Sequence, residues 1–338
     1  MTPSQMTSPQ QASPASSTAI TAQQLRKHYS GGVKDAGLNG FDLEVRKGTV
    51  CGLLGPNGAG KTTAIKILTT LLQMDSGKAQ VAGFDVVRQA RQVRENIGLV
   101  GQYAAIDEVL TGRQNLVMFG QLNHLSNRQA QHRADELLAQ FALTDAARLP
   151  VGKYSGGMRR RLDIAVSLIT SPPILFVDEP TTGLDPVSRR EVWAALRARV
   201  SAGTTILLTT QYLEEADELA DRISMLKAGR VVAEGTPDEL KSAFGSDWLD
   251  LVLNFDTDLN AVTRIVERVA AGPVNVDAEA KRISVPVKER TRALVTVATA
   301  LSEAGITPDD LSLRRPTLDE VFIHLTGSAE ADVQQEIA

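Results

Sequence analysis

The stretch Gly55-Pro-Asn-Gly-Ala-Gly-Lys61-Thr62-Thr63 fits the pattern G-x-x-x-x-G-K-T. An apolar run from Val50 to Leu54 precedes it, and a run from Lys61 to Gln73 follows with Ile65, Leu68 and Leu72 on one helical face. A strand, a glycine-rich loop and a helix in this order distinguish a phosphate-binding P-loop from a chance match. The alternative, a glycine-rich turn with a surface lysine, does not explain the offset of the Lys61-Thr62 pair.

The P-loop predicts binding of a nucleoside triphosphate with magnesium. Glycines let backbone N–H groups turn inward, and the helix N-terminus adds partial positive charge. Lys61 would neutralise the β- and γ-phosphates, and Thr62 would place its hydroxyl on the metal. The residues that we predict to contact the nucleotide here are Gly55, Pro56, Asn57, Gly58, Ala59, Gly60, Lys61, Thr62 and Thr63.

A second glycine-bearing loop, Tyr154-Ser-Gly-Gly-Met158, comes before the run Ile174-Leu-Phe-Val-Asp178-Glu179. Asp178 ends a predicted buried strand, where a carboxylate is costly unless it meets a cation such as magnesium held through water. Glu179 can polarise the attacking water as a general base. An Asp-Glu pair alone could equally be a helix N-cap. The ordered set of motifs indicates an ATPase that drives mechanical work.

Composition limits the other classes of function. The 338 residues are 43% apolar and 22% charged, which is ordinary for a globular protein of two domains. A net charge of −4 argues against nucleic acid as the main partner, so we expect none. The lone Cys51 lies in an apolar run and suits a reducing compartment. No stretch is apolar enough to span a membrane or resembles a signal peptide, so we expect a cytosolic chain.

The chain divides by composition and rhythm. Residues 1–19 are rich in Ser, Thr, Pro, Gln and Ala and are predicted to be a disordered tail. Residues 20–245 alternate apolar and amphipathic runs, typical of an α/β domain with a mostly parallel sheet. Within them, a helical subdomain is expected at about 103–170, where a helical stretch from Thr111 to Phe141 breaks at Asn123–Ser126.

Residues 246–328 are predicted to form a small C-terminal α+β domain, and residues 329–338 a flexible tail. Strands are expected at Trp248–Phe255, Val274–Val276, Ile283–Val285 and Leu311–Leu313. Apolar residues recur at helical spacing from Leu259 to Val269 and from Leu294 to Leu301, so a helix is expected in each range. A last helix is expected from Thr317. The resulting order β-α-β-β-α-β is ferredoxin-like.

The motifs together resemble the nucleotide-binding subunits of ABC transporters, over about residues 22–240. The resemblance rests on Tyr154–Met158, Ile174–Pro180, Gly183-Leu-Asp185, and Gln102 after the run Ile97–Val100. Within that superfamily, three longer stretches look like the daunorubicin/doxorubicin-resistance type: Tyr154–Arg161, Thr209–Asp217 and Arg314–Phe322. This resemblance implies a P-loop NTPase fold.

The resemblance also implies roles for single residues. Ser155, Gly156 and Gly157 would contact the γ-phosphate bound to the opposite subunit, and Asp185 would link the two sites at the dimer interface. Gln102 would join magnesium and the attacking water to the helical subdomain. Tyr29 would stack on adenine, although a strand aromatic that fills the core is the alternative. Most relatives carry His where this chain has Gln211, which would contact the γ-phosphate beside the catalytic Glu179 and Lys61.

The predicted function is therefore that of the ATP-binding and ATP-hydrolysing subunit of an ABC exporter. It would act as a homodimer on the cytoplasmic side of the cell membrane, bound to a separate integral-membrane permease, with ATP and Mg²⁺. Its cargo would be anthracycline-like drugs or lipid-like molecules. A motor for another cargo, a soluble ABC protein acting on ribosomes or DNA, and a drug-sequestering protein are the alternatives. The Arg159–Arg161 run is interpreted as a solvated or interface helix face.

Overall fold

The computed structural model describes residues 17–29, 37–101, 106–243, 247–254 and 257–322. The described residues form two compact units: one comprises residues up to Gln211 together with Leu226–Val231, the other Tyr212–Met225 and the residues from Val232 onward. The predicted domain boundary after residue 245 stays a prediction. No helix in these ranges is long and apolar enough to cross a bilayer.

An antiparallel sheet opens the chain, in the strand order β2-β1-β4-β5. Its first strand begins at Thr18, so the last two residues of the tail that composition predicts belong to a strand. The hydrophobic side chains of this sheet alternate with exposed ones along β2, which is the pattern of a sheet with one buried face. The strands are β1 (Thr18–His28), β2 (Gly37–Arg46), β4 (Ser76–Val81) and β5 (Phe84–Asp85).

The central sheet has the strand order β10-β9-β3-β8-β7-β6, and β3, β8, β7 and β6 run parallel. Every residue of β3, β7 and β8 is buried, because helices and a second layer cover both faces of these strands. The strands predicted at Val50–Leu54 and Ile174–Val177 are confirmed. The strands are β3 (Val50–Leu54), β6 (Ile97–Val100), β7 (Ile174–Asp178), β8 (Thr205–Thr210), β9 (Arg222–Lys227) and β10 (Arg230–Gly235).

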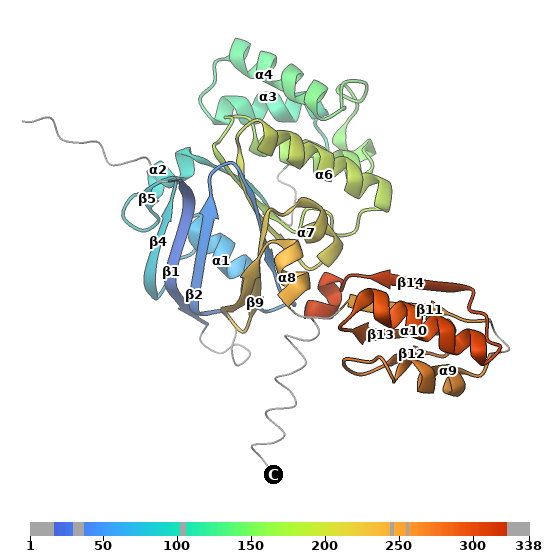
Figure 1. Ribbon diagram of the computed structural model, residues 1–338. Helices are drawn as coiled ribbons and strands as arrows, with labels where there is room; N and C mark the ends of the chain where they lie inside the picture. The colour runs from blue at the N-terminus through green and yellow to red at the C-terminus, as the bar shows by residue number, and fades with distance from the viewer. Residues whose placement is uncertain (1–16, 30–36, 102–105, 244–246, 255–256, 323–338) are drawn as a thin grey trace, which may run out of the picture. The chain divides into compact units, whose positions relative to one another are not determined.

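Helix α1 (Lys61–Leu68) lies between the two sheets, and its Ile65, Ile67 and Leu68 join one core with residues of both (Figure 1). The helix predicted from Lys61 to Gln73 is five residues too long. Thr69 ends it by turning its hydroxyl back onto the carbonyl of Ile65 at 2.8 Å, and Thr70 adopts a left-handed φ of 65°. The apolar Leu72 packs on the core from outside the helix.

The helical part of this unit contains the predicted break. Helices α3 (Gly112–Leu122) and α4 (Asn127–Gln140) are separate, because Ser126 starts α4 with a reciprocal capping box to Gln129. Thr111 and Gln114 form the same motif at the start of α3. The other helices of this unit are α2 (Ala90–Glu95), the short 3₁₀ helix η1 (Val151–Lys153), α5 (Gly156–Ser167) and α6 (Pro186–Ser201).

The second unit includes α7 (Leu213–Leu219), α8 (Pro237–Ala243) and a small α+β domain. The predicted order β-α-β-β-α-β is observed, in an antiparallel sheet ordered β12-β13-β11-β14 around its own apolar core. Residues 318–322 are helical as predicted, one residue later than Thr317, which caps them. The elements are β11 (Asp247–Val252), α9 (Leu259–Val266), β12 (Asn275–Asp277), β13 (Arg282–Val287), α10 (Arg290–Glu303) and β14 (Asp310–Arg314).

Candidate nucleotide-binding site

The parallel strands bring the predicted motifs to one edge of the central sheet. The P-loop follows β3, Gln211 follows β8, and Asp178 ends β7, with Glu179 immediately after it. The registers place Leu54 opposite Thr210, and Asp178 opposite Thr209. Ligands of open α/β sheets bind outside the carboxyl ends of the strands. Motifs that are far apart in the sequence therefore meet in one place.

Lys61 is a buried cation at this edge. Its side chain is 5% exposed, and its Nζ donates to the carbonyls of Gly55 at 2.7 Å and Pro56 at 3.2 Å. Nζ also lies 3.7 Å from Oε1 of Glu179. Burial lowers the pKa of Lys61, and the nearby carboxylates of Glu179 and Asp178 oppose that shift. A buried ammonium at a P-loop is suited to bind phosphate oxygens.

The loop backbone has the shape of an anion cradle. A side chain at Gly55 would place its Cβ 2.4 Å from the carbonyl oxygen of Leu226, and one at Gly60, where φ is 109°, would come within 2.5 Å of the carbonyl of Gly37. No side chain caps the start of α1, and no acid lies in its first turn. Unlike the capped α3 and α4, this helix leaves its first N–H groups for an anion.

An oxygen-rich cluster lies beside Lys61. The Thr62 hydroxyl donates to Oδ2 of Asp178 at 3.3 Å, and the Thr209 hydroxyl donates to Oδ1 of the same carboxylate. Asp178 is buried, and each of its carboxylate oxygens accepts one of these hydrogen bonds. A carboxylate next to a hydroxyl is the kind of oxygen donor set that Mg²⁺ prefers. These residues therefore fit a magnesium ion that accompanies a nucleotide.

Glu179 is held in an unusual backbone conformation. Its φ is 47°, in the left-handed region, and its N–H donates to the Thr209 carbonyl at 3.0 Å. Its side chain is 11% exposed, and the Thr182 hydroxyl donates to Oε2 at 3.4 Å. Left-handed backbone at a residue other than glycine persists where the surroundings over-determine it, and such residues cluster at active sites. The conformation directs the Glu179 carboxylate to Lys61.

Three other residues are predicted to contact the nucleotide, and the structure describes two of them. Tyr29 is 45% exposed, which disfavours its reading as a core aromatic, and its hydroxyl lies 3.3 Å from Oγ1 of Thr63. Gln211 is exposed just beyond β8. Gln102 lies outside the described residues, although β6 ends only two positions before it. The roles of all three stay predictions.

The second glycine loop begins α5 and lies among different neighbours. Ser155 caps the helix by accepting a hydrogen bond from the Met158 N–H at 3.2 Å. A side chain at Gly157 would meet Oγ of Ser188 at 2.5 Å, so Gly157 is required for α5 to pack on α6 whatever it binds. Gly156 is exposed, and the nearest group to a Cβ there would be Leu184 at 3.4 Å. These neighbours are not P-loop residues.

Asp185 has a structural role that the motif does not reveal. Its Oδ1 caps α6 by accepting from the N–H groups of Val187 and Ser188, each at 3.0 Å. The Ser188 hydroxyl donates to Oδ2 at 2.6 Å, and this bond with the backbone ones lowers the pKa of Asp185. Its predicted contact across a dimer interface is not tested by a single chain.

Sequence reasoning missed the role of Arg160. The run Arg159–Arg161 was predicted to be a solvated or interface face, but the side chains of Arg160 and Arg161 are only 11% and 12% exposed. Arg160 donates to backbone carbonyls on both sides of Glu179, whereas Arg161 donates to the carbonyl of Phe141 and pairs with Glu191. A run of three arginines carries no signal that separates these roles.

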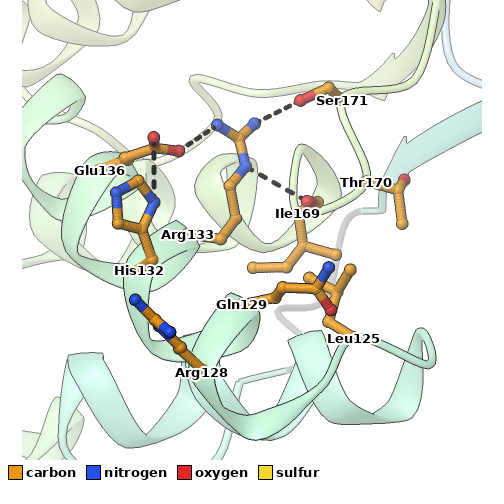
Figure 2. Close-up of a pocket in the computed structure, with 9 residues that line it drawn as sticks. All are labelled: Leu125, Arg128, Gln129, His132, Arg133, Glu136, Ile169, Thr170 and Ser171. Carbon is orange, nitrogen blue, oxygen red and sulfur yellow. Dashed lines mark hydrogen bonds and ion pairs between the residues drawn. The ribbon is translucent and has the colours of Figure 1, made fainter.

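One further hollow, of about 520 Å³, lies on the helical part between α4 and residues 169–171. Figure 2 shows that Arg133 spans it, donating to Glu136 at 3.0 Å, to Ser171 at 2.6 Å and to the carbonyl of Ile169 at 3.2 Å. His132 also lies 3.2 Å from Glu136. The hollow contains none of the predicted nucleotide contacts. Arg133 braces α4 on the loop that follows α5.

Comparisons with known proteins agree with this geometry. Residues 38–182 match the ABC transporter family model. The daunorubicin resistance ATP-binding protein DrrA2 of Streptomyces coeruleorubidus is 57% identical over 91% of this chain and 95% of its own length. The daunorubicin/doxorubicin resistance ATP-binding protein DrrA of Streptomyces peucetius is 46% identical over 95% of this chain and 96% of its own. A solved dimeric ATP-binding cassette in a post-hydrolysis state, bound to ADP and phosphate, is 25% identical, with a TM-score of 0.57 over 64% of this chain and 98% of that one.

Proposed function

Because this chain belongs to the daunorubicin/doxorubicin-resistance family of ABC transporter ATP-binding proteins, we propose that it is the ATPase motor of an exporter that removes drugs or lipid-like molecules. The observation that carries the proposal is the cluster of Lys61, Thr62, Asp178 and Glu179 at the carboxyl edge of the parallel strands. Binding and hydrolysis of ATP is the activity of this class, and the P-loop supports it here.

The chemistry follows from the placement of the charges. The loop from Gly55 to Thr63 would hold the phosphates, with Lys61 neutralising the β- and γ-phosphates and Tyr29 stacking on the base. Thr62, Asp178 and Gln102 would hold a magnesium ion, which neutralises the charge that develops on the transferred phosphoryl group. Glu179 would accept a proton from the attacking water, and Gln211 would hydrogen-bond to the γ-phosphate.

We infer that two copies of the chain act together on the cytoplasmic side of the membrane. Ser155, Gly156 and Gly157 would contact the ATP held by the other copy, and Asp185 would lie at the interface. A separate membrane permease would carry the cargo, and it would select between drugs and lipid-like molecules.

Replacing Glu179 by Gln tests the proposal. The amide keeps the shape but cannot accept the water's proton, so hydrolysis should fall by about 10²- to 10⁴-fold. ATP binding should persist, and the variant should form a stable dimer when ATP is present. Steady-state ATP turnover, nucleotide affinity and size-exclusion chromatography with light scattering would measure these three quantities.

Glu95→Gln is the matched control, because Glu95 is an exposed residue of α2 that pairs with Arg91. It should turn over ATP as the unmodified chain does and should form no trapped dimer. Undiminished hydrolysis by Glu179→Gln, or a monomer at saturating ATP, would contradict the proposal.

A further inference from the structure

Arg160 joins three segments of the chain, two of which flank Glu179 in the sequence. From α5, its Nε donates to the Pro180 carbonyl at 2.8 Å, and its Nη2 donates to the Asp178 carbonyl at 3.1 Å. Its Nη1 donates to the carbonyl of Gly101 at 2.7 Å, just beyond β6. A single side chain thus contacts the residue after β6, the last residue of β7 and the segment that follows β7.

The contacts suit the chemistry of a guanidinium. The group is planar, always charged, and carries five N–H donors in a fixed fork. Hydrogen bonds from a charged donor are stronger than neutral ones, and they weaken little at a site that is 11% exposed. Asp163, which is also buried, lies 3.2 Å from Nη1 and balances the charge. A lysine ammonium could not reach three carbonyls in this arrangement.

The two carbonyls on β7 and after it flank Glu179. Arg160 therefore fixes the peptide group before Glu179 and the carbonyl of the residue after it, while the Glu179 N–H is fixed by the Thr209 carbonyl. The left-handed φ of 47° at Glu179 is held from both sides. Loss of either anchor would let the backbone relax to a more favourable conformation and would move the carboxylate from Lys61.

We propose that Arg160 is a positioning residue that sets the orientation of Glu179 and ties it to the helix that begins with Ser155, Gly156 and Gly157. This inference rests on the proposed ATPase function. Since α5 would contact the ATP held by the other copy, a movement of α5 is transmitted through Arg160 to the carboxylate of the chain's own site. One side chain thus links the two half-sites that each chain supplies.

The test uses Arg160→Gln and Arg160→Lys in the full chain. Gln keeps part of the length but loses the charge and the fork, and Lys keeps the charge alone. We expect Arg160→Gln to lower kcat for ATP by about 10-fold or more, with KM changed by less than about 3-fold, because Glu179 acts on the attacking water and not on nucleotide binding. The kcat of Arg160→Lys should lie between that of Arg160→Gln and that of the unmodified chain.

Arg159→Gln is the matched control on the same helix, because Arg159 is 39% exposed and pairs with Glu108. Its kcat should stay within about 2-fold of the unmodified value. Thermal unfolding with and without ATP would establish that each variant is folded. If Arg160→Gln does not fold, Arg160→Lys alone carries the test of kcat against KM.

A double-mutant cycle separates positioning from general structural damage. If Arg160 acts through Glu179, adding Arg160→Gln to Glu179→Gln should slow single-turnover hydrolysis no further. Additive losses, or an unchanged kcat in Arg160→Gln, would overturn the inference. Absence of ATP turnover in the unmodified chain would instead refute the proposed function, so the two failures are distinguishable.

Discussion

Charged side chains at the carboxyl edge of the sheet have partners within the chain. The ammonium of Lys61 sits between two loop carbonyls and the Glu179 carboxylate, and Asp178 accepts hydrogen bonds from two hydroxyls. Buried charges need such partners. A phosphate that binds Lys61 would therefore have to replace these carbonyl and carboxylate partners.

Gln211 gives a prediction at this scale. Gln211→Ala would remove the proposed hydrogen bond from the uncharged amide to the charged γ-phosphate, a loss of about 1.5–3 kcal/mol, so ATP turnover at saturating ATP should fall by about 10- to 150-fold. Nucleotide affinity should change less. The measurement is steady-state phosphate release, with Gln211→His as a comparison that restores a donor. Turnover that does not change in Gln211→Ala would show that this residue takes no part in hydrolysis.

Sequence patterns predict these residues only when an offset is fixed by chemistry. Two motifs with a fixed internal spacing, the P-loop and the acidic end of a strand, identify the residues that the fold brings together: Lys61, Thr62, Asp178 and Glu179. Arg160 obeys no such pattern, since its partners are backbone carbonyls at Gly101, Asp178 and Pro180, which have no side-chain signature. The same limit explains why the packing requirement at Gly157 is visible only in the fold.

The elements differ in what their boundaries depend on. Helices α3 and α4 begin after Thr111 and Ser126, each of which is followed by a glutamine three residues later. Both helix starts are therefore set by residues close together in the sequence. The end of α1 depends on the Thr69 hydroxyl and the left-handed Thr70, and apolar periodicity continues past both. Periodicity alone therefore extends the helix too far.

Within the C-terminal domain, one acid joins three elements. Asp250 on β11 is 3% exposed and accepts from Arg282 on β13 and from Arg314 on β14, the latter at 2.8 Å. Arg314 also pairs with Glu320 at 2.7 Å and lies 5.4 Å from the ring centre of Trp248. Burial would raise the pKa of Asp250 and of Glu320, but the arginine hydrogen bonds outweigh it and hold both pKa values below their usual range.

These lowered pKa values predict acid sensitivity. A carboxyl whose pKa is lower in the folded state contributes stability that is present above the unfolded pKa, about 4, and is lost as the pH falls through the folded value. The free energy of unfolding of this domain should therefore decrease below about pH 4. Asp250→Asn should lose about 2 kcal/mol at pH 7 and should flatten that dependence.

Trp248 fluorescence during urea unfolding would measure the effect in the full chain, with Trp193→Phe in every variant to leave one reporter in the sequence. Arg282→Gln is the graded comparison, because that side chain is more exposed than Arg314 and should contribute less. An equally steep acid dependence in Asp250→Asn would rule out this carboxyl as its source.

At the scale of the whole molecule, the proposed dimer divides each site between two chains. A mixture of Lys61→Ala and Ser155→Ala chains should recover activity, because half of the random dimers contain one intact site. We expect up to about a quarter of the unmodified rate from the mixture and almost none from either variant alone. ATP turnover of the separate and mixed variants at equal total concentration is the measurement.

The double variant Lys61→Ala/Ser155→Ala is the control for the mixture. When it is mixed with unmodified chains, both sites of every mixed dimer are damaged. Turnover should then be lower than if the unmodified chains were only diluted by an inactive protein. Recovery that fails in the first mixture would argue against shared sites, provided that each variant still folds.

The pairing of β3 with β8 has a consequence for the order in which the chain folds. Val50 lies opposite Ile206 and Leu54 opposite Thr210, so the strand that carries the P-loop lacks this neighbour until residue 210 has left the ribosome. The hairpin of α3 and α4 needs only local contacts and can form much earlier. The loop that we propose to hold ATP is synthesised well before β8, so the scaffold of the loop closes late. ATP can therefore draw the nascent chain toward its native state only near the end of that domain's synthesis.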